Sequence, residues 1–154
     1  MANDVALKDA EEVLAQDYLI IHIADQMFGV AVTQVQDVLR HMDFTRVPLA
    51  PGEVSGALNL RGRIVTAINV RKKLGLPTLE SDAKPMSVVV EHDNELYSLM
   101  IDKVADVISI ENAQIKDTPP TLDEVWQDIS NGIYRMDGRL LLLMDVSKLL
   151  GNVS

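Results

Sequence analysis

The chain has 154 residues, 47% of them hydrophobic, so it can bury roughly two-thirds of the surface that its unfolded form exposes. It contains no cysteine, which excludes disulfides and thiolate-held metal sites and fits a reducing cytoplasm. With 23 acidic and 14 basic side chains the net charge is −9, which disfavours nucleic acid and anionic membranes as partners. No signal sequence and no apolar run of about 18 residues is present, so we expect a cytoplasmic protein.

The first half of the chain alternates between short apolar runs and turn formers. Its acidic opening segment has apolar residues near helical spacing, so residues 1–17 are expected to form a helical or flexible extension, with the helix running from Asn3 or Asp4 to Gln16. The further elements expected here are strands 18–23 and 27–30, a brief helix over 32–39 with a capping box at Thr33 and Gln36, strands 56–60 and 63–70, and a helical turn over 71–74.

The second half repeats the strand and hairpin pattern after a segment, 76–85, that has the composition of a linker. The elements expected here are strands 86–90, 96–101 and 104–110, a polar loop over 111–131 that carries Trp126, a hairpin of strands 133–136 and 139–144, and a closing helical turn over 146–150 capped by Asp145. The chain is therefore predicted to be all-β, or mainly β with a few short helices.

An internal repeat underlies this pattern. Residues 56–75 align without a gap on residues 132–151, and seven of the aligned pairs are identical. At an offset of 69, a second set of residues around Phe28 and Val38 matches residues around Tyr97 and Val107 in the same order. A period near 70 suits two similar small β-units, which predicts two five-stranded SH3-like β-barrel subdomains. We place the first barrel at 18–80 and the second at 85–151, within one domain over 18–151.

The two copies of the repeated hairpin differ at the turn. The second copy has Asp137-Gly138, and both of these residue types accept the positive φ of a two-residue hairpin turn. The first copy has Arg61-Gly62, and an arginine gains little from such a turn for its own sake. One interpretation is a solvated side chain at a permissive turn. The other is that Arg61 meets a carboxylate or carbonyl groups on a partner.

The segment Asn59-Leu60-Arg61-Gly62, followed by an apolar strand and then Asn69-Val70-Arg71, resembles the chemotaxis coupling proteins of the CheW family. Further segments match in the same order along residues 18–151, including those at 35–38, 45–48 and 101–107. The resemblance implies two five-stranded barrels packed over a shared hydrophobic core.

The same resemblance implies a non-catalytic adaptor without a cofactor, which links the helical tips of chemoreceptors to the regulatory domain of the histidine kinase CheA. Such an adaptor would be associated with receptor arrays at the membrane without contacting the membrane itself. The receptor contacts implied for this chain are Val35, Asp37, Gly56, Asn59, Leu60, Arg61, Gly62 and Val107. The residues that contact the kinase are not indicated.

Other functions find weaker support in the sequence. His22, His41 and His92 lack metal-ligand spacing, and no nucleophile elbow or phosphate-binding loop is present, so we expect neither a metal site nor catalysis. A nucleic-acid-binding small barrel, a scaffold of a non-flagellar chemosensory pathway and a hydrolase using Glu91 and Asp93 are the alternatives. Arg61, Arg63 and residues 71–73 form the one basic concentration, which is either a solvated face or a docking patch.

Overall fold

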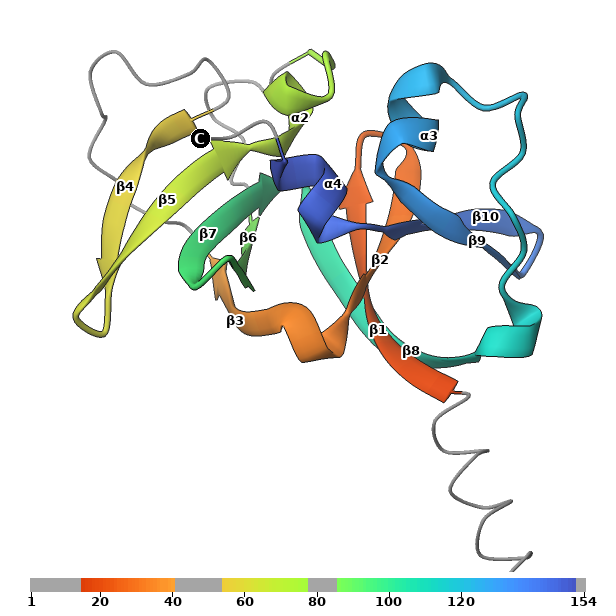
Figure 1. Cartoon of the computed structure of the whole chain (residues 1–154), viewed down its shortest axis with the longest axis horizontal. Helices are drawn as coiled ribbons and strands as arrows, with labels where there is room; N and C mark the ends of the chain where they lie inside the picture. The colour runs from red at the N-terminus through yellow and green to blue at the C-terminus, as the bar shows by residue number, and fades with distance from the viewer. Residues whose placement is uncertain (1–14, 41–53, 78–85, 152–154) are drawn as a thin grey trace, which may run out of the picture.

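The computed structural model describes residues 15–40, 54–77 and 86–151, and these form two five-stranded sheets with a few short helices (Figure 1). The strands are β1 (Ala15–Ile23), β2 (Gln26–Ala31), β3 (Val35–Arg40), β4 (Val54–Leu60), β5 (Arg63–Asn69), β6 (Met86–His92), β7 (Glu95–Ile101), β8 (Lys103–Glu111), β9 (Ser130–Met136) and β10 (Arg139–Met144). The helices are α2 (Val70–Lys73), α3 (Glu124–Ile129) and α4 (Val146–Leu150), with 3-10 turns η1 (Val32–Gln34) and η2 (Asn112–Gln114). The expected mainly β fold with two five-stranded sheets is confirmed.

Each sheet takes strands from both halves of the chain. The first sheet has the order β8-β1-β2-β10-β9 and the second has the order β3-β6-β7-β5-β4. The two sheets therefore do not follow the division at 18–80 and 85–151 that was expected for the barrels. The β1–β2 hairpin completes the sheet that β8, β9 and β10 form, and the β6–β7 hairpin completes the sheet of β3, β4 and β5.

The repeat seen in the sequence is reflected in this topology. Its two offsets match β2, β3, β4 and β5 to β7, β8, β9 and β10, in that order, and the adjoining strands β1 and β6 occupy equivalent positions. When equivalent strands are substituted, the orders of the two sheets become identical, including the parallel pairs β2 with β10 and β7 with β5. The two units are thus alike, and each inserts its leading hairpin into the sheet of the other.

The largest hydrophobic cluster lies between the two sheets. It joins Ile21 and Phe28 of the first sheet to Ile68 and Leu99 of the second, all of them fully buried, and includes residues of the three helices. The other face of each sheet has a smaller cluster of its own, one around Ile20 and the other around Val65, Val89 and Leu96. Strands such as β1 are buried on both faces, which explains their nearly continuous apolar sequence.

A carboxylate links the two sheets where the chain passes from one to the other. Asp102 follows β7 of the second sheet and precedes β8 of the first. Its oxygens accept hydrogen bonds from Nε and Nη2 of Arg71 in α2, at 2.7 and 2.6 Å, and from the backbone N–H of Ala24 in the β1–β2 turn, at 2.8 Å. The backbone N–H of Asp102 donates to the His22 carbonyl. A bidentate, charge-assisted pair of this kind fixes geometry as well as adding stability.

Two local expectations were wrong. The helix expected over 32–39 is only the turn η1, after which β3 pairs with β6. Val35 of β3 packs against the shared core and Leu39 packs against the second sheet's own cluster, so pairing and burial override the weak helical signal. The segment 111–131, expected to be a loop, contains the helix α3. Trp126 of this helix packs on Phe28, with ring centroids 5.3 Å apart.

The remaining local expectations largely agree with the structure. β1 begins at Ala15, so residues 15–17 are strand and not part of the N-terminal extension, whose other residues, together with most of 76–85, lie outside the described ranges. Asp145 caps α4 as expected, and Asn69 caps α2 in the same way, each accepting a backbone N–H at 3.1 Å. None of the helices in the described ranges is long and apolar enough to cross a bilayer.

The exchange of hairpins predicts that the halves of the chain depend on each other. A fragment of residues 1–80 and a fragment of residues 81–154 each lack two strands of one sheet and three of the other, and each exposes the shared core. We expect neither fragment alone to unfold cooperatively, and the equimolar mixture to regain the strand spectrum and the size of the intact chain. Circular dichroism and size-exclusion chromatography measure this. Cooperative unfolding of either fragment alone would contradict the exchange.

The link through Asp102 predicts a stability cost for Asp102→Asn. The substitution keeps the shape of the side chain but leaves the guanidinium of Arg71, whose side chain is 16% exposed, without its charged partner. We expect the free energy of unfolding to fall by about 1–3 kcal/mol, measured by urea denaturation. Asp106→Asn, at an exposed carboxylate of β8, is the matched control and should change it by less than about 0.5 kcal/mol. Equal losses in the two variants would contradict the role of Asp102.

Candidate protein-binding site

The β4–β5 turn has a defined backbone geometry. Arg61 and Gly62 have φ of 52° and 84°, and the Asn59 side-chain oxygen accepts the Gly62 N–H at 2.9 Å. Asp137 and Gly138 of the equivalent β9–β10 turn have φ of 50° and 76°. Positive φ at both central residues is the geometry that suits a two-residue hairpin. The two turns thus share one backbone conformation, and the arginine occupies a position that does not favour it.

Arg61 forms an ion pair that the sequence did not indicate. Its Nη2 lies 3.2 Å from an Asp37 oxygen, and the side chains of Arg61 and Asp37 are 79% and 24% exposed. The other Asp37 oxygen accepts the Val38 N–H at 2.8 Å. A pair this exposed contributes at most about 1 kcal/mol to stability. Asp37 therefore orients the guanidinium while leaving most of its surface open to a partner.

The ion pair joins the two edges of the second sheet. Asp37 belongs to the edge strand β3, and Arg61 lies in the turn that follows the opposite edge strand, β4. The strand register shifts between Val35 and Asp37 in β3, and between Val54 and Gly56 in β4. Irregularities of this type turn neighbouring side chains and are frequent at binding sites.

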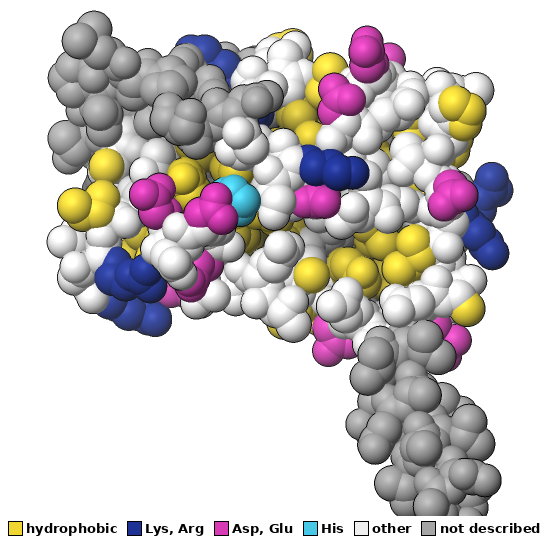
Figure 2. Space-filling view, in the orientation of Figure 1, with side chains coloured by type: hydrophobic (Ala, Val, Ile, Leu, Met, Phe, Trp, Pro, Cys, Tyr) yellow, Lys and Arg dark blue, Asp and Glu magenta, His cyan; other side chains and the backbone are white. Residues whose placement is uncertain are grey.

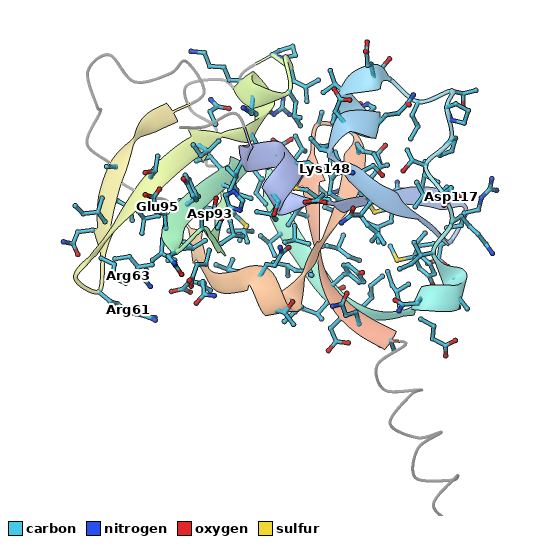
Figure 3. The ribbon with its side chains drawn as sticks, viewed as in Figure 1. Arg61, Arg63, Asp93, Glu95, Asp117 and Lys148 are labelled. Atoms are coloured by element: carbon cyan, nitrogen blue, oxygen red, sulfur yellow. The ribbon has the colours of Figure 1, made fainter. Side chains whose placement is uncertain are left out.

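The structure brings together most of the predicted contact residues. Asp37, Asn59, Arg61 and Gly62 are linked directly by the contacts above, and Leu60 packs against the second sheet's own cluster. Figure 3 shows Arg61 and Arg63 projecting from the tip of the hairpin at one end of the molecule. In Figure 2 this tip is a group of basic side chains beside acidic ones.

Val107 stands apart from this group. It lies on β8 of the first sheet, where it pairs with Leu19, and it is 54% exposed. Among the described residues, no hydrogen bond or ion pair joins it to the Arg61 turn. The side chain of Val35 is half-buried against the shared core, and Gly56 is buried. A partner that contacts all the predicted residues would therefore have to cross from one sheet to the other.

The basic residues near the turn have different surroundings. Arg63 is exposed, whereas Arg71 is mostly buried in its pair with Asp102, and that hydrogen bond raises the pKa of Arg71. Arg71 is thus neither part of a solvated face nor part of an exposed docking patch, the two interpretations considered above. The sequence offered no local signal for either ion pair, because the partners lie in strands or helices far apart along the chain. Within the described ranges, no group of three or more His, Asp or Glu residues could hold a metal ion.

Comparisons with known proteins identify relatives of this chain. A family model described as a CheW-like domain matches residues 17–154. A chemotaxis protein CheW of Klebsiella aerogenes is 28% identical over 145 residues, which cover 94% of this chain and 87% of the relative. A chemotaxis protein CheW of Thermotoga maritima is 29% identical over 138 residues, covering 90% of this chain and 89% of the relative.

A solved structure has the same fold. The crystal structure of the scaffolding protein TtCheW from Thermoanaerobacter tengcongensis aligns with a TM-score of 0.77 over 88% of this chain and 87% of that chain, at 24% identity. At this identity the likeness supports the architecture of two packed sheets only. The family follows from the match of the domain model over nearly the whole sequence, and on this ground the chain belongs to the CheW-like domain family.

Proposed function

We propose that this protein is a non-catalytic adaptor that couples chemoreceptors to the histidine kinase CheA in chemotaxis signalling. Family membership and the names of the relatives, chemotaxis proteins and a scaffolding protein, support this proposal. The observation that carries it is the Arg61 turn. A rigid hairpin presents a largely exposed guanidinium at a position where the equivalent hairpin has only a turn-forming aspartate.

In this proposal the helical tip of a receptor contacts the surface made by the Asn59–Gly62 turn, by Val35, Asp37 and Gly56, and by Val107 of the other sheet. The guanidinium of Arg61 donates to a carboxylate or to carbonyl groups of the receptor, and Asp37 holds it in the required orientation. The kinase regulatory domain binds elsewhere on the chain. The assembly places the protein at receptor arrays on the cytoplasmic side of the membrane.

The first test is binding of a purified receptor cytoplasmic fragment and of the kinase, measured by pull-down and by isothermal titration calorimetry. Arg61→Glu should weaken receptor or kinase coupling by ~1–3 kcal/mol, because it reverses a charged hydrogen-bond donor. The melting temperature should stay nearly constant, since the side chain is exposed. Arg135→Glu, which makes the same charge change on exposed β9, should bind normally.

The charge-swap double variant Asp37→Arg with Arg61→Asp tests why Arg61→Glu weakens binding. The cause is either loss of the cation at the hairpin tip or loss of the ion pair with Asp37. The double variant retains an ion pair but removes the cation from the hairpin tip. We expect it to keep the stability of the wild type and not to recover receptor binding. Recovery of full affinity would mean that the ion pair itself, and not the cation at the tip, is what the partner requires. If the unmodified chain binds neither receptor nor kinase, the adaptor function is wrong.

Two glycines allow a second, matched test of the turn. Gly62 and Gly138 both have positive φ, and a Cβ added at either would meet nothing within 4 Å. Gly62→Ala and Gly138→Ala should therefore each cost about 1 kcal/mol of stability through backbone strain alone, measured by thermal unfolding. Only Gly62→Ala should also weaken receptor binding. Equal effects of both variants on binding would show that the β4–β5 turn has no special role.

A further inference from the structure

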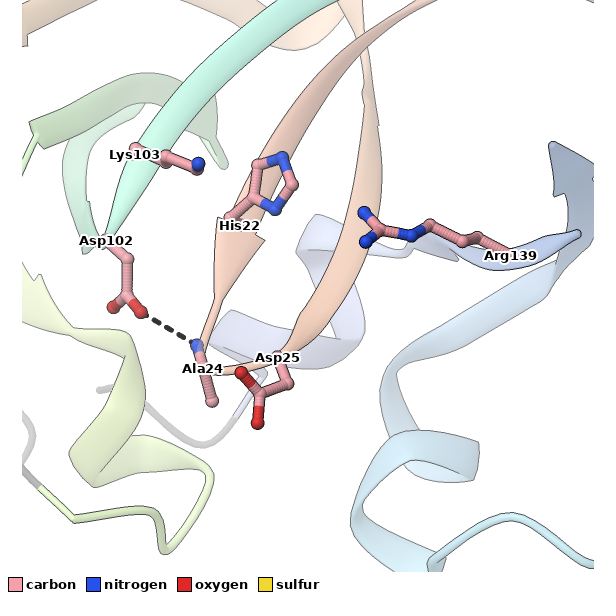
Figure 4. A pocket seen from close by; sticks show the side chains of 6 residues that line it. All are labelled: His22, Ala24, Asp25, Asp102, Lys103 and Arg139. Carbon is pink, nitrogen blue, oxygen red and sulfur yellow. Dashed lines mark hydrogen bonds between the residues drawn. The ribbon is translucent and has the colours of Figure 1, made fainter. Parts of the chain in front are cut away.

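An open hollow of about 470 Å³ lies on the first sheet beside the β1–β2 turn, lined by His22, Ala24, Asp25, Asp102, Lys103 and Arg139 (Figure 4). His22 belongs to β1 and is paired across the strands with Lys103 of β8. Arg139 begins β10, whose next residue accepts a hydrogen bond from the side chain of Gln26 at 2.8 Å. Three strands of one sheet and the β1–β2 turn thus hold the lining residues in place.

Two cationic side chains converge on this hollow. Figure 4 shows Lys103 and Arg139 pointing toward the His22 ring from opposite sides. Both side chains are exposed, and among the described residues neither has a carboxylate within ion-pair distance. Two converging cations, neither paired with a carboxylate of the described residues, are notable on a chain whose net charge is −9.

The acidic residues of the hollow do not neutralise these cations. Asp102 already accepts hydrogen bonds from Arg71 and from the Ala24 N–H. Asp25 lies at the exposed β1–β2 turn and forms no ion pair with Lys103 or Arg139. The N–H and N⁺–H donors of Lys103 and Arg139 are therefore the groups that the hollow offers to a ligand.

The imidazole of His22 reports on this electrostatic environment. Burial lowers its pKa, and the charges of Lys103 and Arg139 lower it further, while Asp102 acts in the opposite direction. Together with Asp25, these are the charged groups that line the hollow around the ring. The ring is consequently neutral at pH 7, and an anion placed between the two cations would raise its pKa.

The shape of the hollow limits the class of ligand. Small-molecule sites enclose most of the ligand surface in a largely apolar pocket, whereas this hollow is open and its cations lie at the exposed rim. Such a rim suits a protein whose other contacts supply affinity while charge guides association. The net charge of −9 repels densely charged polyanions, such as nucleic acid and anionic membranes, more strongly than a protein segment with one or two carboxylates.

We propose that this hollow receives a glutamate or aspartate side chain from an acidic segment of a protein partner, with Lys103 and Arg139 donating to its carboxylate. The hollow is far from the Arg61 turn in the molecule, since the β1–β2 and β4–β5 turns lie at widely separated places in Figure 1. The surface is therefore additional to the proposed receptor contact and does not depend on it.

The test uses the full chain and a capped pentapeptide, Gly-Glu-Gly-Glu-Gly, with its glutamine analogue as the neutral control. We expect the glutamate peptide to cause saturable NMR shifts at the His22 ring and at the amides of Lys103 and Arg139, and to raise the pKa of His22. The ring of His92, which lies beside Asp93 in the other sheet, is an internal reference and should not respond. Equal shifts with the glutamine peptide would overturn the proposal.

Charge variants test whether the two cations are responsible. The double variant Lys103→Gln with Arg139→Gln should lower the affinity for the glutamate peptide by about fivefold to thirtyfold. The double variant Lys116→Gln with Arg135→Gln removes the same charge from exposed positions outside the hollow and should leave the affinity unchanged. Equal weakening by the two double variants would mean long-range attraction only and would overturn the site. Tighter binding of inorganic phosphate than of the peptide, at matched ionic strength, would assign the hollow to free anions instead.

Discussion

The exchange of hairpins between two similar units is the constraint on which the rest of the structure depends. Because β1–β2 and β6–β7 each complete the sheet of the other unit, neither sheet forms without residues from both halves of the chain. The shared core between the sheets, with Ile21, Phe28, Ile68 and Leu99 fully buried, follows from the same arrangement. Asp102 stands where the chain crosses between sheets, and its hydrogen bonds to Arg71 and to the β1–β2 turn fix that crossing.

The duplicated architecture leaves one hairpin free to differ from its counterpart. Both turns have the same positive-φ geometry, and one uses aspartate while the other uses an arginine paired with Asp37. An exposed pair of this kind contributes little to folding, so the arginine is explained better by what it presents than by what it stabilises. The hollow around His22 follows a similar logic, because neither of its two cations has a carboxylate within ion-pair distance among the described residues.

Local structure was largely readable from the sequence, and the failures have identifiable causes. Alternating apolar runs and glycine-containing turns indicated nine of the ten strands and most of their limits. The missed strand, β3, had valines at spacings that fit a helix equally well, and only pairing with β6 decided between them. The helix α3 follows two prolines in a polar segment, and its anchor, Trp126 on Phe28, is a contact between distant parts of the chain.

The sequence by itself determined nine of the ten described strands, the duplication, and the unusual arginine at a turn where its counterpart is aspartate. Only the tertiary structure decided which strands pair, because two similar units offer equivalent edges and similarity cannot tell pairing within a unit from pairing between units. It also decided the partners of the charged residues. Asp37 with Arg61, Asp102 with Arg71, and Lys103 with Arg139 around His22 are each brought together from separate strands, turns or helices, and electrostatic contacts of that kind depend on distance in space.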